Sequence, residues 1–149
     1  MDRQAAFSGW YYATPSELHL RWENVLIGSP AGPCPAWFFP AESSTWVIQV
    51  HGRGVTRAEC LRAVPVLHAA GFPNLVVSYR NDGEAPRSRS GAYALGSAEW
   101  RDVDSAVAYA LRHGAERVIL MGWSMGGAVA LQTAVNSGNR HRIAGLILE

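Results

Sequence analysis

The sequence predicts an α/β fold built around a mostly parallel sheet. From Trp46 onward, short apolar runs alternate with amphipathic stretches, a pattern that is typical of βαβ units. A glycine-flanked serine also stands between a predicted buried strand and a predicted helix. With 149 residues and 48% hydrophobic content, the chain has the size and composition of one domain with a packed core.

The overall charge favours no polyanionic partner. Thirteen basic and twelve acidic residues give a net charge of +1, so we expect no binding to nucleic acid or to an anionic membrane. The apolar runs are much shorter than the roughly 20 residues that span a bilayer, and no signal peptide is visible after residues 1–4. We therefore expect a cytoplasmic protein that acts on a small molecule.

The first 45 residues differ from the rest of the chain. They are richer in proline and aromatic residues, and 28–35 predicts a turn between two antiparallel strands. No composition shift marks a domain boundary, so we interpret 1–149 as a single, incomplete domain with N-terminal strands and irregular structure in 1–45 and a βαβ core in 46–149. Cys34 and Cys60 match no zinc or disulfide spacing and are expected to be packing residues.

The first βα unit begins with a buried strand over Trp46–Val50, which leads into His51-Gly52-Arg53-Gly54. Thr56 and Glu59 have the spacing of a capping box, in which each side chain satisfies a backbone N–H of the other residue. This spacing predicts that a helix starts there. Pro65 lies inside that helix and is expected to bend it.

A second buried strand is predicted over Leu75–Tyr79, followed by a long polar loop over 80–96. Ser97 can cap the next helix, and Asp102 and Asp104 fall among polar positions that are expected to face solvent. The remaining predicted elements are a strand over 117–121, a helix over 125–136 and a strand over 143–148.

The segment Gly122-Trp123-Ser124-Met125-Gly126 matches the pattern G-x-S-x-G directly after a strand and directly before a helix. Such a sharp turn forces the serine into a strained backbone conformation, and side chains two residues away on either side would collide. Gly122 and Gly126 remove those collisions. The pattern therefore predicts that Ser124 is the nucleophile, presented above the sheet at the start of a helix.

A serine nucleophile also needs N–H donors for the oxyanion that forms when it attacks. The N–H of Met125, directly after the nucleophile, is one expected donor, and the N–H of Arg53 is the other. His51, Gly52 and Gly54 are expected to support that loop. This chemistry needs neither a metal nor an organic cofactor.

These motifs resemble the α/β-hydrolase family, and within it the bacterial esterases and serine peptidase-like hydrolases with an H-G-x-G oxyanion loop. The resemblance runs from Trp46 to Glu149 and rests on the order H-G-R-G, S-Y-R-N and G-W-S-M-G-G. It implies a three-layer fold with an eight-stranded sheet and a triad in the order Ser, acid, His. In the family the acid and the histidine follow strands beyond Glu149, so we expect a fold truncated after the strand that follows the nucleophile helix.

Two interpretations of function stay open. The first is a serine hydrolase, either a carboxylesterase or a peptidase-like enzyme, that cleaves an ester or small amide through an acyl-Ser124 intermediate. The alternative is a catalytically incompetent fragment or a non-catalytic protein of the hydrolase fold, because the triad acid and histidine are missing. The sequence identifies neither the substrate nor the oligomeric state.

Other candidates for the missing groups and other classes of site are less favoured. None of the five histidines is expected to be the base, and His51 is expected to have a structural role. Glu149 is set aside as the acid because a terminal residue is held loosely. Arg80, Arg87 and Arg89 are expected to be solvated in their loop. A phosphate-binding βαβ unit is disfavoured because no P-loop or G-x-G-x-x-G pattern follows a predicted strand.

Overall fold

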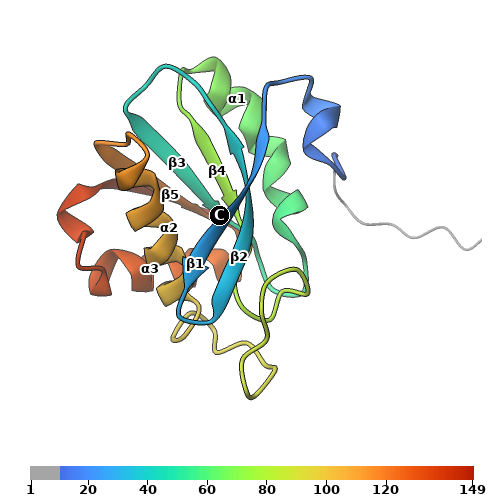
Figure 1. The fold of residues 1–149 in the computed structure, drawn as a ribbon, viewed down its shortest axis with the longest axis vertical. Coiled ribbons are helices and arrows are strands. Elements are labelled where there is room, and N and C mark those ends of the chain that lie inside the picture. The colour runs from blue at the N-terminus through green and yellow to red at the C-terminus, as the bar shows by residue number, and fades with distance from the viewer. Residues whose placement is uncertain (1–10) are drawn as a thin grey trace, which may run out of the picture.

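The computed structural model describes residues 11–149, which form a six-stranded sheet with helices on both faces (Figure 1). The strands are β1 (Glu23–Ser29), β2 (Gly32–Phe39), β3 (Thr45–Val50), β4 (Asn74–Val77), β5 (Arg117–Gly122) and β6 (Ile143–Leu148). The α-helices are α1 (Val64–Ala69), α2 (Trp100–Arg112) and α3 (Met125–Asn136). Three 3₁₀ segments complete the fold: η1 (Pro15–Leu18), η2 (Arg57–Ala63) and η3 (Arg140–Arg142).

The strand order across the sheet is β1-β2-β4-β3-β5-β6. β1 and β2 form an antiparallel hairpin, and β2 runs antiparallel to β4. The other three pairings, β3 with β4, β3 with β5 and β5 with β6, are all parallel. The prediction of a mostly parallel α/β sheet is confirmed, and the carboxyl ends of β3 to β6 meet at one edge, where α/β proteins place their ligand sites.

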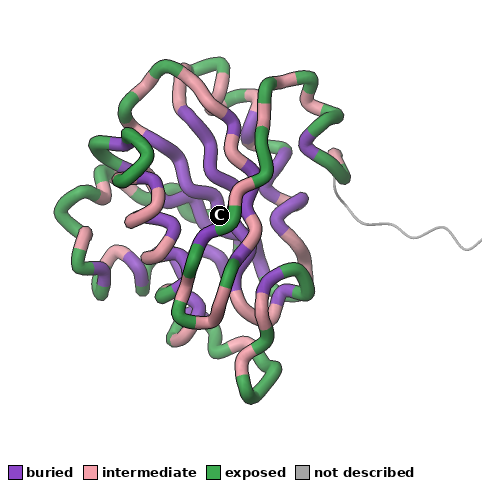
Figure 2. Tube along the Cα trace, in the orientation of Figure 1, coloured by how far each residue is buried: buried purple, intermediate pink, exposed green. Residues whose placement is uncertain are grey.

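The central strands of the sheet, β3, β4 and most of β5, are buried on both faces, and β3 and β4 are purple in Figure 2. Ile48 and Val107 belong to the core between the sheet and the helices α2 and α3, whereas Val47 and Leu61 belong to the core beneath η2 and α1. Because side chains alternate along a strand, the continuous apolar run of β3 serves both cores at once. This explains why polar and apolar residues do not alternate around Val47 and Ile48.

The N-terminal hairpin exists, but its turn is shorter than the predicted 28–35. β2 already begins at Gly32, so Pro33 and Pro35 lie in a strand. They are tolerated because only the later half of β2, from Ala36 onward, pairs with β4, so both prolines lie on a stretch with one strand neighbour. Cys34 therefore lies in a strand rather than a turn, and both cysteines are buried and free, as expected of packing residues.

The segment after Thr56 is not the predicted capped α-helix. It forms the 3₁₀ segment η2, and α-helical geometry begins only at Val64. Thr56 makes no side-chain cap, because the Glu59 carboxylate instead accepts the N–H of Gly52 at 2.7 Å. Pro65 lies in the first turn of α1, where a missing N–H costs nothing, so it starts the helix rather than bending it.

The start of α2 also differs from the prediction. Ser97 does not cap the helix, which begins at Trp100 after the N-cap residue Glu99. The Glu99 carboxylate is buried and accepts the N–H groups of Ala94 and Gly96 at 2.6 and 2.9 Å. Glu99, the residue before α2, thus fixes the preceding loop through these two hydrogen bonds.

Asp102 was expected to face solvent, and this expectation is wrong. The residue is only 3% exposed, and its carboxylate receives the Arg80 Nε and Nη2 atoms at 2.8 Å each. Arg80 is therefore not a solvated loop arginine either, whereas Arg87 and Arg89 are exposed as expected. Asp104 is half-buried and accepts the Ser137 hydroxyl.

β6 forms one edge of the sheet and is poorly covered. It contains no charged residue, and Leu146, Ile147 and Leu148 are 37%, 39% and 48% exposed. A Cβ added at Gly145 would meet no atom within 4 Å, so one face of the strand is open. Within residues 11–149, no helix has the length and apolar character needed to cross a membrane.

We expect the 149-residue chain to self-associate through β6, because an uncharged apolar edge strand offers unpaired backbone groups to a second strand. Ile147→Lys should reduce the association, since it places a charge on that edge. Leu26→Lys is the matched control, because Leu26 is 68% exposed on β1 at the opposite edge. Light scattering measures the mass of each, and a compact monomer for the unsubstituted chain would contradict the prediction.

Candidate active site

Ser124 occupies a strained turn between β5 and α3. Its backbone angles are φ 51° and ψ −119°, a conformation that residues with a side chain rarely adopt. The turn is held by two hydrogen bonds, from the N–H of Gly126 to the Trp123 carbonyl and from the N–H of Gly127 to the Ser124 carbonyl, both 2.8 Å. Ser124 is exposed although its two neighbours are buried, so the turn presents its side chain outward.

The two glycines of the motif are required by close backbone contacts. A Cβ on Gly122 would lie 2.4 Å from the Gly126 carbonyl oxygen. A Cβ on Gly126 would lie 2.1 Å from the Val50 carbonyl oxygen, so even one methyl group would push the start of α3 away from β3. The collisions that the sequence predicted are therefore present in the fold, and the second one involves a neighbouring strand.

The elbow is bonded to the strands on both sides of it. The N–H of Trp123 donates to the Val50 carbonyl at 2.9 Å, and the N–H of Ser124 donates to the Glu149 carbonyl at 2.6 Å. Glu149 in turn donates its N–H to the Gly122 carbonyl at 3.0 Å. Ser124 is thus fixed by the extensions of β3 and β6, at the carboxyl edge of the sheet.

Two backbone N–H groups near Ser124 have no acceptor among residues 11–149, those of Arg53 and Met125. The N–H of Gly52, the residue before Arg53, already donates to the Glu59 carboxylate. The loop lies against the elbow, since a Cβ added at Gly52 would be 3.3 Å from the Ser124 Cβ. The two unpaired donors are the ones that the sequence predicted for an oxyanion.

His51 is fully buried beneath this loop and is engaged through both ring nitrogens. Its Nε2 lies 2.9 Å from Asp82 Oδ2, and its Nδ1 lies 2.8 Å from the Gly52 carbonyl oxygen. The ring stacks on Tyr79 with centroids 4.2 Å apart. This environment leaves neither nitrogen available to the Ser124 hydroxyl.

Asp82 is a buried residue that the sequence analysis missed. Its carboxylate also accepts the N–H groups of Tyr79, Glu84 and Ala85 at 3.2, 2.9 and 2.8 Å. Burial alone raises the pKa of Asp82, but the hydrogen bonds from His51 and from the backbone outweigh it, so the pKa lies below its ordinary value. The signal that could have identified it is the dipeptide Asp82-Gly83, which is typical of a turn in which the aspartate accepts nearby backbone N–H groups.

Within residues 11–149, no side chain forms a hydrogen bond with the Ser124 hydroxyl. His68 Nε2 is bound to the Pro40 carbonyl at 3.0 Å, and His113 Nδ1 to the Tyr109 carbonyl at 2.8 Å. His19 and His141 are exposed. In the described part of the chain, the exposed Ser124 hydroxyl and the two unpaired N–H groups thus lie together with no histidine in contact.

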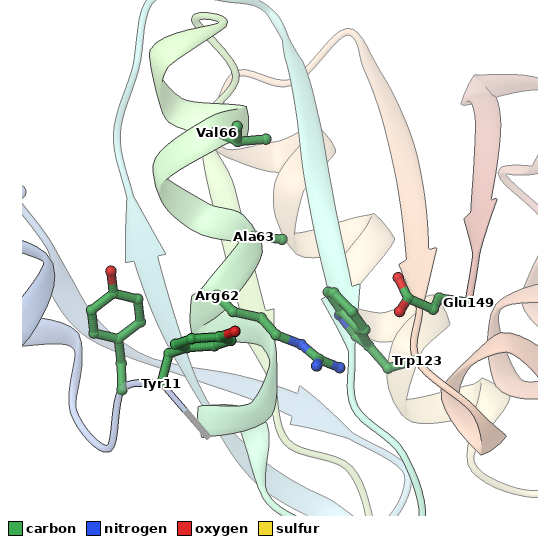
Figure 3. Close-up of a pocket in the computed structure, with 7 residues that line it drawn as sticks. Tyr11, Arg62, Ala63, Val66, Trp123 and Glu149 are labelled. Carbon is green, nitrogen blue, oxygen red and sulfur yellow. The ribbon is translucent and has the colours of Figure 1, made fainter. Parts of the chain in front are cut away.

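A hollow of about 530 Å³ lies on the α1 side of the sheet (Figure 3). The Trp123 side chain forms part of its wall and is only 5% exposed, as expected of a core residue. The Arg62 guanidinium lies 4.0 Å above the Trp123 ring, and Glu149 lies on the other side of that ring. The described residues contain no cluster of three or more His, Cys, Asp or Glu side chains that would hold a metal.

Comparison with solved structures shows which folds this chain resembles. An esterase from Pyrococcus furiosus matches with a TM-score of 0.77 and 22% identity, over 90% of this chain and 54% of the esterase. An epoxide hydrolase from an endophytic Streptomyces matches with a TM-score of 0.70 and 23% identity, over 85% of this chain and 36% of the hydrolase. A bottromycin epimerase matches with a TM-score of 0.64 and 28% identity, over 85% of this chain and 47% of the epimerase. The chain spans about half the length of these proteins or less.

A search of curated proteins found no match. The model of the family described as "Alpha/beta hydrolase family" matches residues 47–149, which is more than two thirds of the chain. The matched region includes the loop 51–54, the turn at Ser124 and the strands β4 to β6, and it agrees with the predicted resemblance from Trp46 to Glu149. Its fold and its sequence therefore place this chain in the α/β hydrolase family.

Proposed function

We propose that this protein is a serine hydrolase that cleaves a carboxylic ester or a small amide through an acyl-Ser124 intermediate. The observation that carries the proposal is the strained, outward-facing Ser124 beside the unpaired N–H groups of Arg53 and Met125. A strained turn that exposes one hydroxyl is costly to maintain, and such strain concentrates at functional sites. Family membership and the fold of the Pyrococcus furiosus esterase support a hydrolase.

In the proposed reaction, the Ser124 oxygen attacks the carbonyl carbon of the substrate while a base takes the hydroxyl proton. The carbonyl oxygen becomes an oxyanion and accepts hydrogen bonds from the Arg53 and Met125 N–H groups. The tetrahedral intermediate expels the alcohol or amine, which takes up that proton. Water then hydrolyses the acyl-Ser124 ester. The mechanism uses no metal or organic cofactor.

A second candidate is a protein of the hydrolase fold without hydrolase activity. It is favoured by the Ser124 hydroxyl, which has no side-chain partner among residues 11–149. An unassisted serine loses most of its reactivity. One solved structure of similar fold is described as an epimerase, so the fold also serves other reactions.

We further propose that the partner is a small molecule in the cytoplasm rather than a nucleic acid or a membrane. The net charge of +1 supports this, because it gives the chain no general attraction to polyanions. The two candidate functions share this partner class and differ in whether the bound molecule is cleaved.

Labelling by a fluorophosphonate probe separates the two candidates. In this protein, Ser124→Ala should abolish labelling and lower ester turnover by about 10³-fold or more, because it removes the proposed nucleophile. Ser90→Ala is the matched control, since Ser90 is an exposed loop serine, and it should label normally. Full labelling of the Ser124→Ala variant would contradict the proposed nucleophile.

The same probe applied to the 149-residue chain locates the base. We expect labelling to be much slower than for a serine hydrolase whose histidine contacts its nucleophile, because no histidine in residues 11–149 contacts the Ser124 hydroxyl. A rate equal to that of such a hydrolase would show that a group within this chain takes the proton.

Gly126→Ala should destabilise the fold by roughly 1–3 kcal/mol or more, the range for forcing extra atoms into filled space. The physical reason is the 2.1 Å approach of the new Cβ to the Val50 carbonyl oxygen. Gly138→Ala is the control, because its Cβ would meet no atom within 4 Å. Urea denaturation measures both, and equal midpoints would contradict the close contact.

A further inference from the structure

The peptide group between Gly52 and Arg53 connects the buried histidine to the proposed oxyanion site. The Gly52 carbonyl and the Arg53 N–H belong to one planar unit, and all peptide bonds of the described residues are trans. In a trans peptide the N–H points in the direction opposite to the C=O. Whatever holds the Gly52 carbonyl therefore sets the direction of the Arg53 N–H.

Two donors hold the Gly52 carbonyl oxygen from the buried side. His51 Nδ1 lies 2.8 Å from it, and the Tyr79 hydroxyl donates to it at 3.2 Å and to the His51 carbonyl at 2.8 Å. Burial raises the pKa of Tyr79, so its hydroxyl stays protonated and remains a donor. The carbonyl points toward the buried ring of His51, so the Arg53 N–H is directed away from it.

The contacts of His51 also determine how many protons its ring carries. The Gly52 carbonyl can only accept, so Nδ1 must donate. Asp82 accepts three backbone N–H groups and its pKa lies below the ordinary value, so it is an ionised carboxylate and Nε2 must donate as well. Both contacts are satisfied together only when the ring is an imidazolium paired with Asp82. A charged donor binds a carbonyl more strongly than a neutral one.

We propose that His51, held as an imidazolium by Asp82, is a positioning residue that locks the Gly52–Arg53 peptide so that the Arg53 N–H faces the oxyanion. This role rests on the proposed hydrolase function. Asp82 acts through His51 and contacts no reacting atom. The pair lies beneath the loop, where both side chains are fully buried, so solvent does not compete for the Gly52 carbonyl.

The first test is nitrogen-15 NMR of the folded protein and needs no activity. At neutral pH we expect two protonated ring nitrogens on His51. In Asp82→Asn the ring should keep one proton, and the Arg53 amide resonance should move. Asp102→Asn is the matched control, because it removes another buried carboxylate that binds Arg80 instead of His51. The Arg53 resonance should stay in place there.

A milder variant covers the case in which Asp82→Asn does not fold. Tyr79→Phe keeps the ring that stacks on His51 and removes only the hydroxyl that donates to the Gly52 carbonyl. The Arg53 amide resonance should shift in this variant too. One ring proton on His51 in the unsubstituted protein would overturn the proposal. An Arg53 resonance that stays in place in the folded variants would overturn it as well.

The second test compares an ester with its thionoester, whose C=S sulfur is a weak hydrogen-bond acceptor. Asp82→Asn should lower kcat for the ester by about 10-fold or more with KM unchanged, approaching the 10²–10³-fold cost of losing one oxyanion donor. The preference for the ester over the thionoester should shrink in parallel, whereas Asp102→Asn should preserve it.

The outcomes of the two tests separate the positioning role from the function it rests on. An unchanged preference in an active Asp82→Asn variant would overturn the positioning role and leave the hydrolase function standing. Absence of any Ser124-dependent turnover would instead overturn the function. The NMR test would still decide whether Asp82 controls the Gly52–Arg53 peptide.

Discussion

The contact between Gly126 and the Val50 carbonyl is the constraint on which the rest of the site depends. It brings the first turn of α3 directly against the end of β3, with no room for a side chain between them. That approach forces a sharp turn at Ser124. The turn exposes the Ser124 hydroxyl and leaves the Met125 N–H unpaired. The absence of a side chain at Gly126 thus determines the positions of Ser124 and of the Met125 N–H.

Buried polar side chains lie at the edge of the sheet beside this contact. His51, Tyr79 and Asp82 form one buried hydrogen-bonded set beneath the loop 51–54, and Gln49 binds Asn74 at 2.8 Å. Buried polar groups are costly unless they are satisfied, and here each of these side chains has a hydrogen-bond partner. Such a satisfied network fixes backbone directions that apolar packing alone would leave loose.

The sequence predicted the features that depend on local pattern. The apolar runs of β3, β5 and β6 and the glycines of the elbow were identified because strand burial and tight turns leave their signature within a few residues. The errors at polar side chains concern partners outside the local element, whereas the ends of helices and turns were misplaced by a few residues. Asp102 is buried because of Arg80, 22 residues away, and Glu59 binds Gly52 rather than capping its own helix. Asp82 was missed because its partner His51 is 31 residues away.

The burial of Cys34 and Cys60 has a practical meaning beyond packing. Burial raises the pKa of Cys34 to about 11 and that of Cys60 well above its ordinary value, so neither thiol forms the reactive thiolate at neutral pH. These are the only two cysteines in the 149 residues. We therefore expect both native thiols to react slowly with thiol reagents, so that a cysteine introduced on the surface would be the preferred attachment point for a spectroscopic reporter.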